Sequence, residues 1–145
     1  MRSRFAAFAV GLGPYLVSTL AAGHADLELP REELVRELSQ ARARQRFLGL
    51  RILFAGLVAA DQGEVLFFAR IFEKGQDRSF AELSRFLRED GLWRYASGIC
   101  VPKADLPEDL AGALDAAQLT PARAEEVRKT FGLLTSARLL GSRRQ

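Results

Sequence analysis

Four segments between residues 47 and 99 are rich in branched and aromatic side chains, and turn-forming residues separate them. They span residues 47–58, 64–72, 80–88 and 92–99. This composition is typical of β-strands. The separators, Asp61-Gln62-Gly63, Gly75-Gln76-Asp77 and Asp90-Gly91, tolerate the positive φ angles that tight hairpins require. The pattern predicts a four-stranded antiparallel sheet in which consecutive strands are neighbours.

The second of these strands is apolar on both of its faces. Val65, Phe67, Ala69 and Ile71 point one way, while Leu66, Phe68, Arg70 and Phe72 point the other way. A strand with two apolar faces is typical of a sheet that is covered on both sides. We therefore expect this strand to lie in the centre of the sheet.

Helical patterns flank the strands on both sides. Residues 5–12 and 15–22 predict two short helices, and Pro30 stands at a plausible first position of a third. After the strands, Pro107 and Pro121 each mark a helix start, Thr120 is a candidate N-cap, and Gly132 is expected to interrupt the last helix. Helices, then a sheet, then helices predict an α+β fold.

The first twenty-five residues imitate a secretory signal, because two arginines precede an apolar stretch that ends in small residues. Gly11, Gly13 and Pro14 interrupt that stretch and favour two helices of a folded domain instead. A membrane span needs about 20 uninterrupted apolar residues, which this segment does not provide. We expect no membrane association.

Charge and composition exclude several classes of site. The chain has 145 residues, and 21 Lys+Arg against 18 Asp+Glu give a net charge of only +3, too weak to indicate nucleic-acid binding by itself. One cysteine, Cys100, excludes an intrachain disulfide and a pair of thiolate ligands. One histidine, His24, excludes a site with two histidine ligands. We expect neither a metal nor a cofactor.

Three stretches, in order, carry a family resemblance. They are Met1-Arg2-Ser3-Arg4-Phe5 with Tyr15-Leu16, then Phe47-Leu48-Gly49-Leu50, then Ser84-Arg85-Phe86-Leu87-Arg88-Glu89-Asp90-Gly91-Leu92-Trp93-Arg94-Tyr95. With this order and spacing, roughly residues 1–100 resemble the YchJ-like family, a branch of the nuclear-transport-factor-2-like (NTF2-like) cone folds. The resemblance implies N-terminal helices packed on a curved sheet, forming a cone whose mouth holds a small ligand or packs against a second copy. It also implies that the first stretch is part of the folded domain, so we expect a cytoplasmic protein.

The resemblance implies a cone domain at residues 1–102. Residues 103–145 lie outside the resemblance, and we expect them to form a C-terminal helical extension that packs on or beside this domain. Members of the family often carry a Cys-rich, zinc-binding SEC-C module next to this domain. Only Cys100 is present here, so zinc binding is not carried over. Whether the missing module reflects a stripped form or a truncated gene model stays open.

Strand alternation brings candidate site residues together. Glu82 shares a face with Ser84, Phe80 and Phe86, while Trp93, Tyr95 and Ser97 share a face of the last strand. If these faces line the cone, Glu82 is a polar anchor in an apolar pocket. A charged strand residue usually faces water, so a solvated Glu82 is the simpler interpretation. The candidate ligand-binding residues are Glu82, Trp93, Tyr95 and Arg4.

Other reactive side chains have simpler interpretations. His24 could take part in acid–base chemistry, but a loop histidine explains it as well. Cys100 has no basic partner at a recognisable spacing and is expected to be packed or half-buried. Arg2, Arg4, Arg85 and Arg88 could form a small basic cluster near the sheet edge.

These observations favour a non-enzymatic domain that binds a small-molecule ligand or a partner, and that could form a homodimer through an open sheet face. The first alternative is an enzyme that uses Glu82 or His24 for acid–base chemistry in the cone. The second is weak nucleic-acid binding through the arginine-rich ends, at Arg2, Arg4, Arg143 and Arg144. No stripe of interleaved basic and aromatic residues accompanies those ends, so this alternative ranks last.

Overall fold

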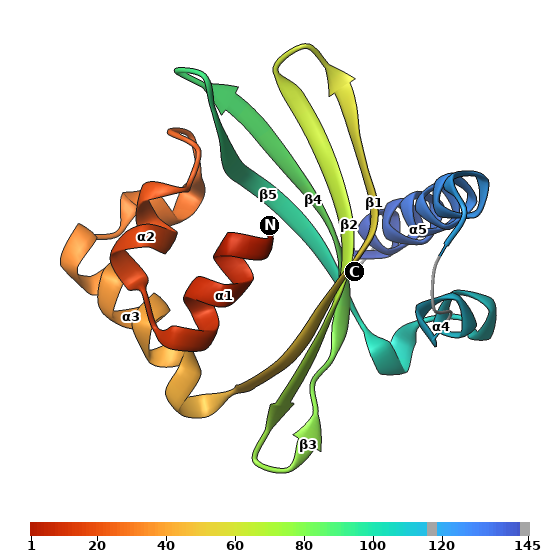
Figure 1. Ribbon diagram of the computed structural model, residues 1–145, viewed down its shortest axis with the longest axis horizontal. Helices are drawn as coiled ribbons and strands as arrows, with labels where there is room; N and C mark the ends of the chain where they lie inside the picture. The colour runs from red at the N-terminus through yellow and green to blue at the C-terminus, as the bar shows by residue number, and fades with distance from the viewer. Residues whose placement is uncertain (116–118, 143–145) are drawn as a thin grey trace.

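The computed structural model describes residues 1–115 and 119–142, which form an α+β fold as predicted (Figure 1). The N-terminal helices are α1 (Arg2–Val10), α2 (Gly13–Ser18), the 3-10 helix η1 (Ala25–Glu28) and α3 (Arg31–Arg44). The strands are β1 (Arg46–Ala59), β2 (Gln62–Glu73), β3 (Gln76–Asp77), β4 (Phe80–Glu89) and β5 (Leu92–Pro102). The chain continues with the 3-10 helix η2 (Lys103–Asp105), α4 (Glu108–Asp115) and α5 (Pro121–Ser142).

The strands form one antiparallel sheet in the order β1-β2-β4-β5, which confirms the predicted meander. The difference is β3, a two-residue strand that pairs with the end of β2 where only a turn was expected. The Asp90-Gly91 turn is confirmed, since both residues have positive φ angles, 51° and 77°. The main strands are slightly longer than predicted, because backbone pairing continues beyond the apolar segments.

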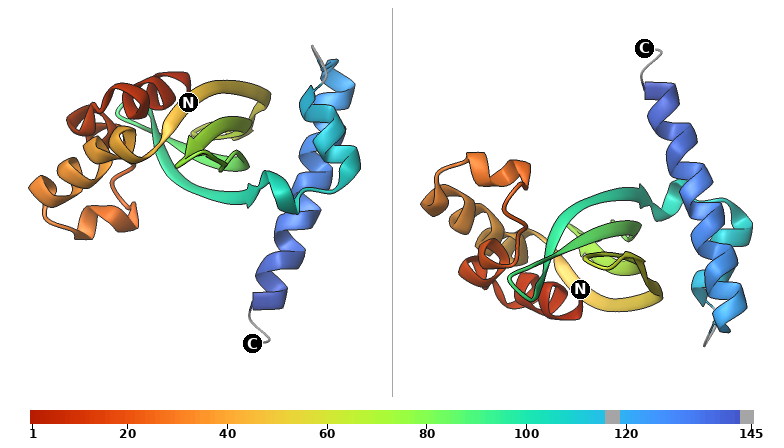
Figure 2. Two further views of the ribbon diagram at one scale, coloured as in Figure 1. Left: turned by 90° about the horizontal axis from the view of Figure 1, so that it is seen from below. Right: turned by 90° about the horizontal axis from the view of Figure 1, so that it is seen from above.

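Helices cover both faces of the curved sheet (Figures 1 and 2). We call the face toward α1, α2 and α3 the inner face, and the face toward α4 and α5 the outer face. On β2, Phe67 and Ala69 are buried on the inner face, while Leu66 and Phe68 are buried on the outer face. The prediction of a central strand covered on both sides is therefore confirmed.

The N-terminal segment forms helices that are integral to the domain. The two helices begin earlier and end earlier than predicted, and Gly11 ends α1 with a left-handed φ of 74°. Gly13 allows α2 to approach α3 closely, because a Cβ there would lie 2.1 Å from Ser39 Oγ and 2.3 Å from the Val35 carbonyl oxygen. Pro30 directly precedes α3 and is not its first residue.

In the described ranges, no helix is both long enough and apolar enough to cross a membrane.

The C-terminal helices α4 and α5 pack on the outer face through one apolar cluster. It joins Leu66, Phe68, Ala81 and Val101 of the sheet to Leu110, Leu114, Val127 and Phe131 of the helices. Thr120 Oγ1 accepts a hydrogen bond from the Arg123 amide at 3.2 Å, confirming the predicted N-cap. The division into a cone domain and an extension stays a prediction.

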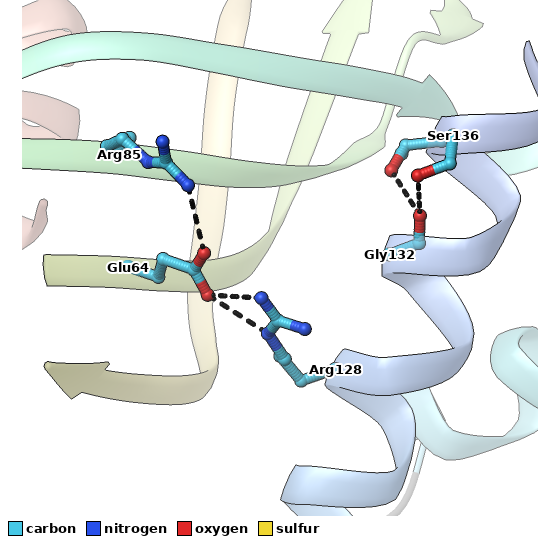
Figure 3. Close-up of polar contacts among 6 residues, drawn as sticks. Glu64, Arg85, Arg128, Gly132 and Ser136 are labelled. Atoms are coloured by element: carbon cyan, nitrogen blue, oxygen red, sulfur yellow. Dashed lines mark hydrogen bonds and ion pairs between the residues drawn. The ribbon is translucent and has the colours of Figure 1, made fainter. Parts of the chain in front are cut away.

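The expected interruption at Gly132 is wrong, because α5 runs through this residue without a break. An interior glycine weakens a helix by about 1 kcal/mol relative to alanine. Burial of Phe131 and Thr135, on either side of Gly132, offsets that loss. The Gly132 carbonyl also accepts hydrogen bonds from Thr135 Oγ1 and Ser136 Oγ (Figure 3).

An ion-pair cluster, which we call the outer clasp, joins α5 to the sheet through Glu64, Arg128 and Arg85 (Figure 3). Glu64 Oε2 accepts hydrogen bonds from Arg128 Nε at 3.0 Å and Nη2 at 2.7 Å. Arg85 Nη2 lies 3.5 Å from Glu64 Oε1. The Glu64 residue is only 7% exposed, so its carboxylate depends on these partners for compensation of its buried charge.

We expect Arg128→Met to lower the free energy of unfolding by about 1–2 kcal/mol, because it leaves a buried carboxylate with one distant cation. Urea unfolding measures this change. Lys129→Met is the control, since Lys129 is the exposed neighbour on the same helix and should change stability by less than about 0.5 kcal/mol. Equal effects of the two variants would mean that the outer clasp does not hold α5.

Candidate functional site

Glu82 of β4 lies inside the cone and is only 7% exposed, so the interpretation of a solvated carboxylate is wrong. The alternation of β4 directs this side chain to the inner face, away from the outer face of the sheet. Ser84 Oγ donates to Glu82 Oε2, as does Tyr95 Oη at 3.2 Å. Cys100 Sγ donates to Oε1 at 2.9 Å. Neutral donors therefore surround both carboxylate oxygens.

A β-bulge in β5 brings these donors to one face. The pairing of β4 with β5 runs from Phe86↔Tyr95 to Arg85↔Ser97 and skips Ala96. The extra residue shifts the alternation of side chains by one position beyond the bulge. Tyr95 and Cys100 therefore both point toward Glu82. The prediction that Ser97 shares the face of Trp93 and Tyr95 is wrong for the same reason, since Ser97 pairs with Arg85 of the outer face.

Gly98 makes the close approach of Glu82 and Tyr95 possible. A Cβ at this position would lie 2.4 Å from Tyr95 Oη and 2.5 Å from Glu82 Cδ, well inside contact distance. Gly98 was not among the residues predicted for the site. A glycine inside a strand is a known signal of a close approach, so the residue could have been found, although its partners could not.

Arg4 of α1 is 6% exposed and lies over the ring of Tyr95, with Cζ 4.9 Å from the ring centroid. Its Nη1 donates to the Leu16 carbonyl oxygen at 2.8 Å and to Thr19 Oγ1. Its Nε is buried without a hydrogen-bond partner. Burial lowers the pKa of Arg4, and the oxygens of Tyr95 and Glu82 oppose that shift. The guanidinium is thus a buried cation within the candidate site.

Tyr95 and Cys100 are protonated and donate hydrogen bonds to Glu82. Burial, followed by the charge of Glu82, raises the pKa of the Tyr95 phenol well above its ordinary value. Cys100 is exposed as a residue at the sheet edge, but partial burial of its thiol and the charge of Glu82 raise the pKa of the thiol strongly. Both groups stay protonated at neutral pH, and a nucleophilic thiolate at Cys100 is disfavoured.

A cavity of about 310 Å³ lies between α1, α3 and the inner face, and we call it the inner cavity. Arg4, Glu82 and Tyr95 line it, so the structure brings three of the four predicted site residues together. Its apolar wall includes five phenylalanines: Phe5, Phe8, Phe47, Phe67 and Phe80. This combination of an apolar wall with a few polar groups is typical of small-molecule sites.

His24 also lines the inner cavity, so it is more than a loop residue. It precedes η1, where its Nδ1 accepts a hydrogen bond from the Asp26 amide at 3.1 Å. Its ring lies 5.7 Å from that of Tyr95, between centroids. The sequence could not place His24 in the same cavity as Glu82, because the two residues lie on segments far apart in the chain.

The fourth predicted residue, Trp93, lies elsewhere. It is 42% exposed and lines a second, more open hollow of about 500 Å³, which we call the mouth pocket. Arg4 lines both spaces and therefore stands between them. Trp93 packs against Gly63 at the end of the sheet, with ring atoms 3.5 Å from the position of a Cβ.

The alternative of a basic cluster of Arg2, Arg4, Arg85 and Arg88 is not supported. Arg4 is buried inside the cone, whereas Arg85 pairs with Glu64 on the outer face. Among the residues that the structure describes, no group of three His, Cys, Asp or Glu side chains is arranged to hold a metal ion.

Comparison with known proteins identifies relatives of this chain. Residues 1–98 match the family described as YchJ_M-like, the YchJ middle NTF2-like domain. A UPF0225 protein from Chromobacterium violaceum is 39% identical over 101 residues, which are 68% of this chain and 70% of that protein. The UPF0225 protein YchJ from Shigella dysenteriae is 38% identical over 101 residues, which are 68% of this chain and 62% of that protein. The match therefore spans less than two thirds of the Shigella protein.

Two solved structures are similar in fold. A SEC-C motif containing protein from Rhodopseudomonas palustris has a TM-score of 0.57 and 30% identity, covering 70% of this chain and 75% of that one. A domain of unknown function with a cystatin-like fold, from Nostoc punctiforme, has a TM-score of 0.55 and 17% identity, covering 95% and 91%. The second likeness shows the fold alone.

We expect Gly98→Ala to lower the free energy of unfolding by about 1–3 kcal/mol, because the added methyl group displaces the Glu82 carboxylate or the Tyr95 phenol. Gly49→Ala on β1 is the control, since no atom lies within 4 Å of the added Cβ there. It should leave stability unchanged or slightly raised. Urea unfolding of both variants is the measurement, and an equal response would contradict the close approach at Gly98.

We expect the phenol of Tyr95 to remain protonated above pH ~10, where a free phenol ionises, because its pKa is raised in the folded state. The Tyr15→Phe variant leaves Tyr95 as the sole tyrosine, so the ultraviolet absorbance of tyrosinate reports on it alone. The folded variant should give little tyrosinate at about pH 10.5, and urea should release the full signal.

The sign of the stability effect follows from the raised pKa. As the pH rises, the unfolded chain loses this proton before the folded protein does. The contribution of Tyr95 to the free energy of unfolding is therefore fully present below pH ~10 and falls above it. Tyrosinate that appears in the folded variant at the ordinary pKa would contradict a buried, Glu82-bound phenol.

Proposed function

This chain belongs to the YchJ family through its NTF2-like middle domain, and we propose that it is a binding module for a small, mainly apolar molecule held in the inner cavity. One observation carries the proposal. The inner cavity combines a wall of phenylalanines with a fixed polar end, formed by Arg4, Glu82 and Tyr95. Its volume of about 310 Å³ suits a compact aromatic ligand of up to three rings.

The polar end is held in place before any ligand arrives. Tyr95 is fixed by its hydrogen bond to Glu82, by its edge contact with Phe86, and by Arg4 above its ring. Its backbone N–H and C=O also bond to the Thr19 carbonyl oxygen and the Ala21 amide, each at 2.8 Å. A rigid site loses little conformational entropy on binding, which favours affinity for a small ligand.

Acid–base catalysis in the same cavity is the second candidate, and the joint presence of His24 and Glu82 is the observation that favours it. Both oxygens of Glu82 already accept hydrogen bonds, and Tyr95 and Cys100 hold their protons. His24 would therefore carry the proton transfer. Binding needs no such step, so it remains the proposal that the geometry supports best.

The sheet-face homodimer stays a proposal and meets an obstacle. The inner face is covered by α1–α3 and the outer face by α4 and α5, so a dimer through either face would displace helices (Figure 1).

Nucleic-acid binding through the chain ends has less support, because Arg4 is buried and does not face solvent. Arg143 and Arg144 lie outside the described residues. Burial of Ala7 and Leu16 supports the N-terminal segment as part of the fold, in line with the proposed cytoplasmic location.

We expect the fluorescence of phenylnaphthylamine, a neutral aromatic reporter, to rise when it enters the inner cavity. Leu38→Trp replaces a leucine at the cavity wall with a bulky indole ring and should weaken binding at least about tenfold, by filling the space. Leu133→Trp is the control, because Leu133 is 74% exposed on α5 and does not line the inner cavity.

Native mass spectrometry of the purified chain complements this titration by revealing any retained small molecule. Absence of reporter binding to the wild-type chain would overturn the proposal. Equal binding by both variants would exclude the inner cavity as the site.

A further inference from the structure

We infer that the ligand of the inner cavity is an aromatic carboxylate, whose ring packs on the phenylalanines and whose carboxylate faces Arg4 and His24. This inference rests on the proposed function and specifies its chemistry. It rests on the hydrogen-bond donors that line the cavity, because Arg4 and His24 each have N–H groups with no partner among the described residues.

Arg4 supplies most of these N–H groups. A guanidinium has five N–H donors, and both hydrogen bonds that Arg4 makes leave from Nη1. Its Nε is buried without a partner, and no hydrogen bond of Nη2 is recorded among the described residues. None of the ion pairs in that part of the chain involves Arg4. Buried charges are ordinarily paired, and a ligand anion that binds to Nη2 would supply such a partner for the guanidinium.

His24 adds a second donor on the same cavity. Its Nδ1 accepts the Asp26 amide hydrogen bond, so a neutral ring carries its proton on Nε2. The described residues provide no acceptor for that N–H within hydrogen-bond distance. The ring is 14% exposed at its side chain, and it lines the inner cavity together with Arg4. A carboxylate has two oxygens and can accept from both residues at once.

The buried carboxylate of the cavity already has three hydrogen-bond donors. Glu82 accepts from Ser84, Tyr95 and Cys100, which leaves a ligand donor little to bind. Asp26 is the other carboxylate on the lining, and its side chain is 53% exposed and therefore solvated. A ligand amine would compete with these three donors for Glu82 and would meet the charge of Arg4. The cavity therefore selects against cationic ligands.

Glu82 also sets the orientation of the ligand. Its charge repels a second carboxylate, and this repulsion decreases with distance. The ligand carboxylate therefore lies on the Arg4 and His24 side, and the ring points toward the phenylalanine wall. Phe5 and Phe8 both contact Phe47, at centroid distances of 5.7 and 6.1 Å, and form the aromatic part of that wall. Flat rings pack well against such surfaces.

The test uses three naphthalene compounds of one shape, substituted at the same ring position: the carboxylate, the carboxamide and the amidinium. Each displaces phenylnaphthylamine from the wild-type full chain in a fluorescence titration. We expect the carboxylate to bind about tenfold more tightly than the amide, because its hydrogen bonds are charge-assisted, and the amidinium to bind most weakly. Equal affinities, or a preference for the amidinium, would overturn the carboxylate assignment.

Variants test which residues produce the preference for the carboxylate. Arg4→Gln should bring the affinities of the carboxylate and the amide to within about twofold of each other, since it removes the charge and leaves a polar side chain. Arg2→Gln removes an exposed arginine of the same helix and should keep the full preference. If Arg4→Gln does not fold, His24→Gln and the wild-type series still decide the question, with a partial loss of preference expected for His24→Gln.

The two proposals fail in different ways. A reporter that does not bind at all contradicts the small-molecule function. A reporter that binds and is displaced equally by all three compounds contradicts only the carboxylate class.

Discussion

The candidate site depends on one extra residue in β5. Alternation along a regular strand would send Tyr95 and Cys100 to opposite faces of the sheet. The bulge at Ala96 removes this restriction, so that both side chains meet Glu82 from the same face. The bulge also lies next to the point where the segment after α2 pairs with Tyr95, through a bridge between Leu20 and Tyr95. The segment that follows α2 is thus attached to β5 next to the bulge.

This arrangement buries two opposite charges that do not form a direct ion pair. Glu82 is compensated by three neutral donors, and Arg4 by a carbonyl, a hydroxyl and the Tyr95 ring. A net hydrogen bond contributes about 1 kcal/mol, whereas an unpaired buried charge costs considerably more. The site is therefore a weak point in the stability of the cone. Such departures from optimal stability are typical of functional sites, where a ligand completes the missing interactions.

Packing of the sheet on both faces compensates for that loss. The inner face buries Phe67, Ala69 and Ile71, and the outer face buries Leu66 and Phe68.

The burial of both sheet faces could be predicted from the sequence, because an alternating apolar pattern is a local property of each strand. The order of the strands followed as well, since short turns join neighbours in space. The boundaries of the helices were less accurate, because caps and tertiary contacts decide where a helix ends.

The site was less predictable than the fold, for physical reasons. Glu82, Tyr95 and Arg4 were identified as candidates, but a strand pattern does not reveal a bulge, and so the role of Gly98 and the facing of Ser97 were missed. Two of the three donors to Glu82, Tyr95 and Cys100, lie on another strand. The place of His24 depends on the path of the segment between α2 and α3. Continuation of α5 through Gly132 was missed because burial of its neighbours outweighs a weak local preference.

The C-terminal helices explain why the predicted sheet-face dimer meets an obstacle in this chain. The family match ends at residue 98, yet Leu66, Phe68 and Ala81, which lie inside the match, are the outer-face residues that α4 and α5 bury. An uncovered apolar sheet face is an association surface, so this face needs a cover. Here the cover comes from the same chain, and the outer clasp attaches it through Glu64. Glu64 also lines the mouth pocket, so the helices that cover the outer face support one wall of the opening that leads toward Arg4.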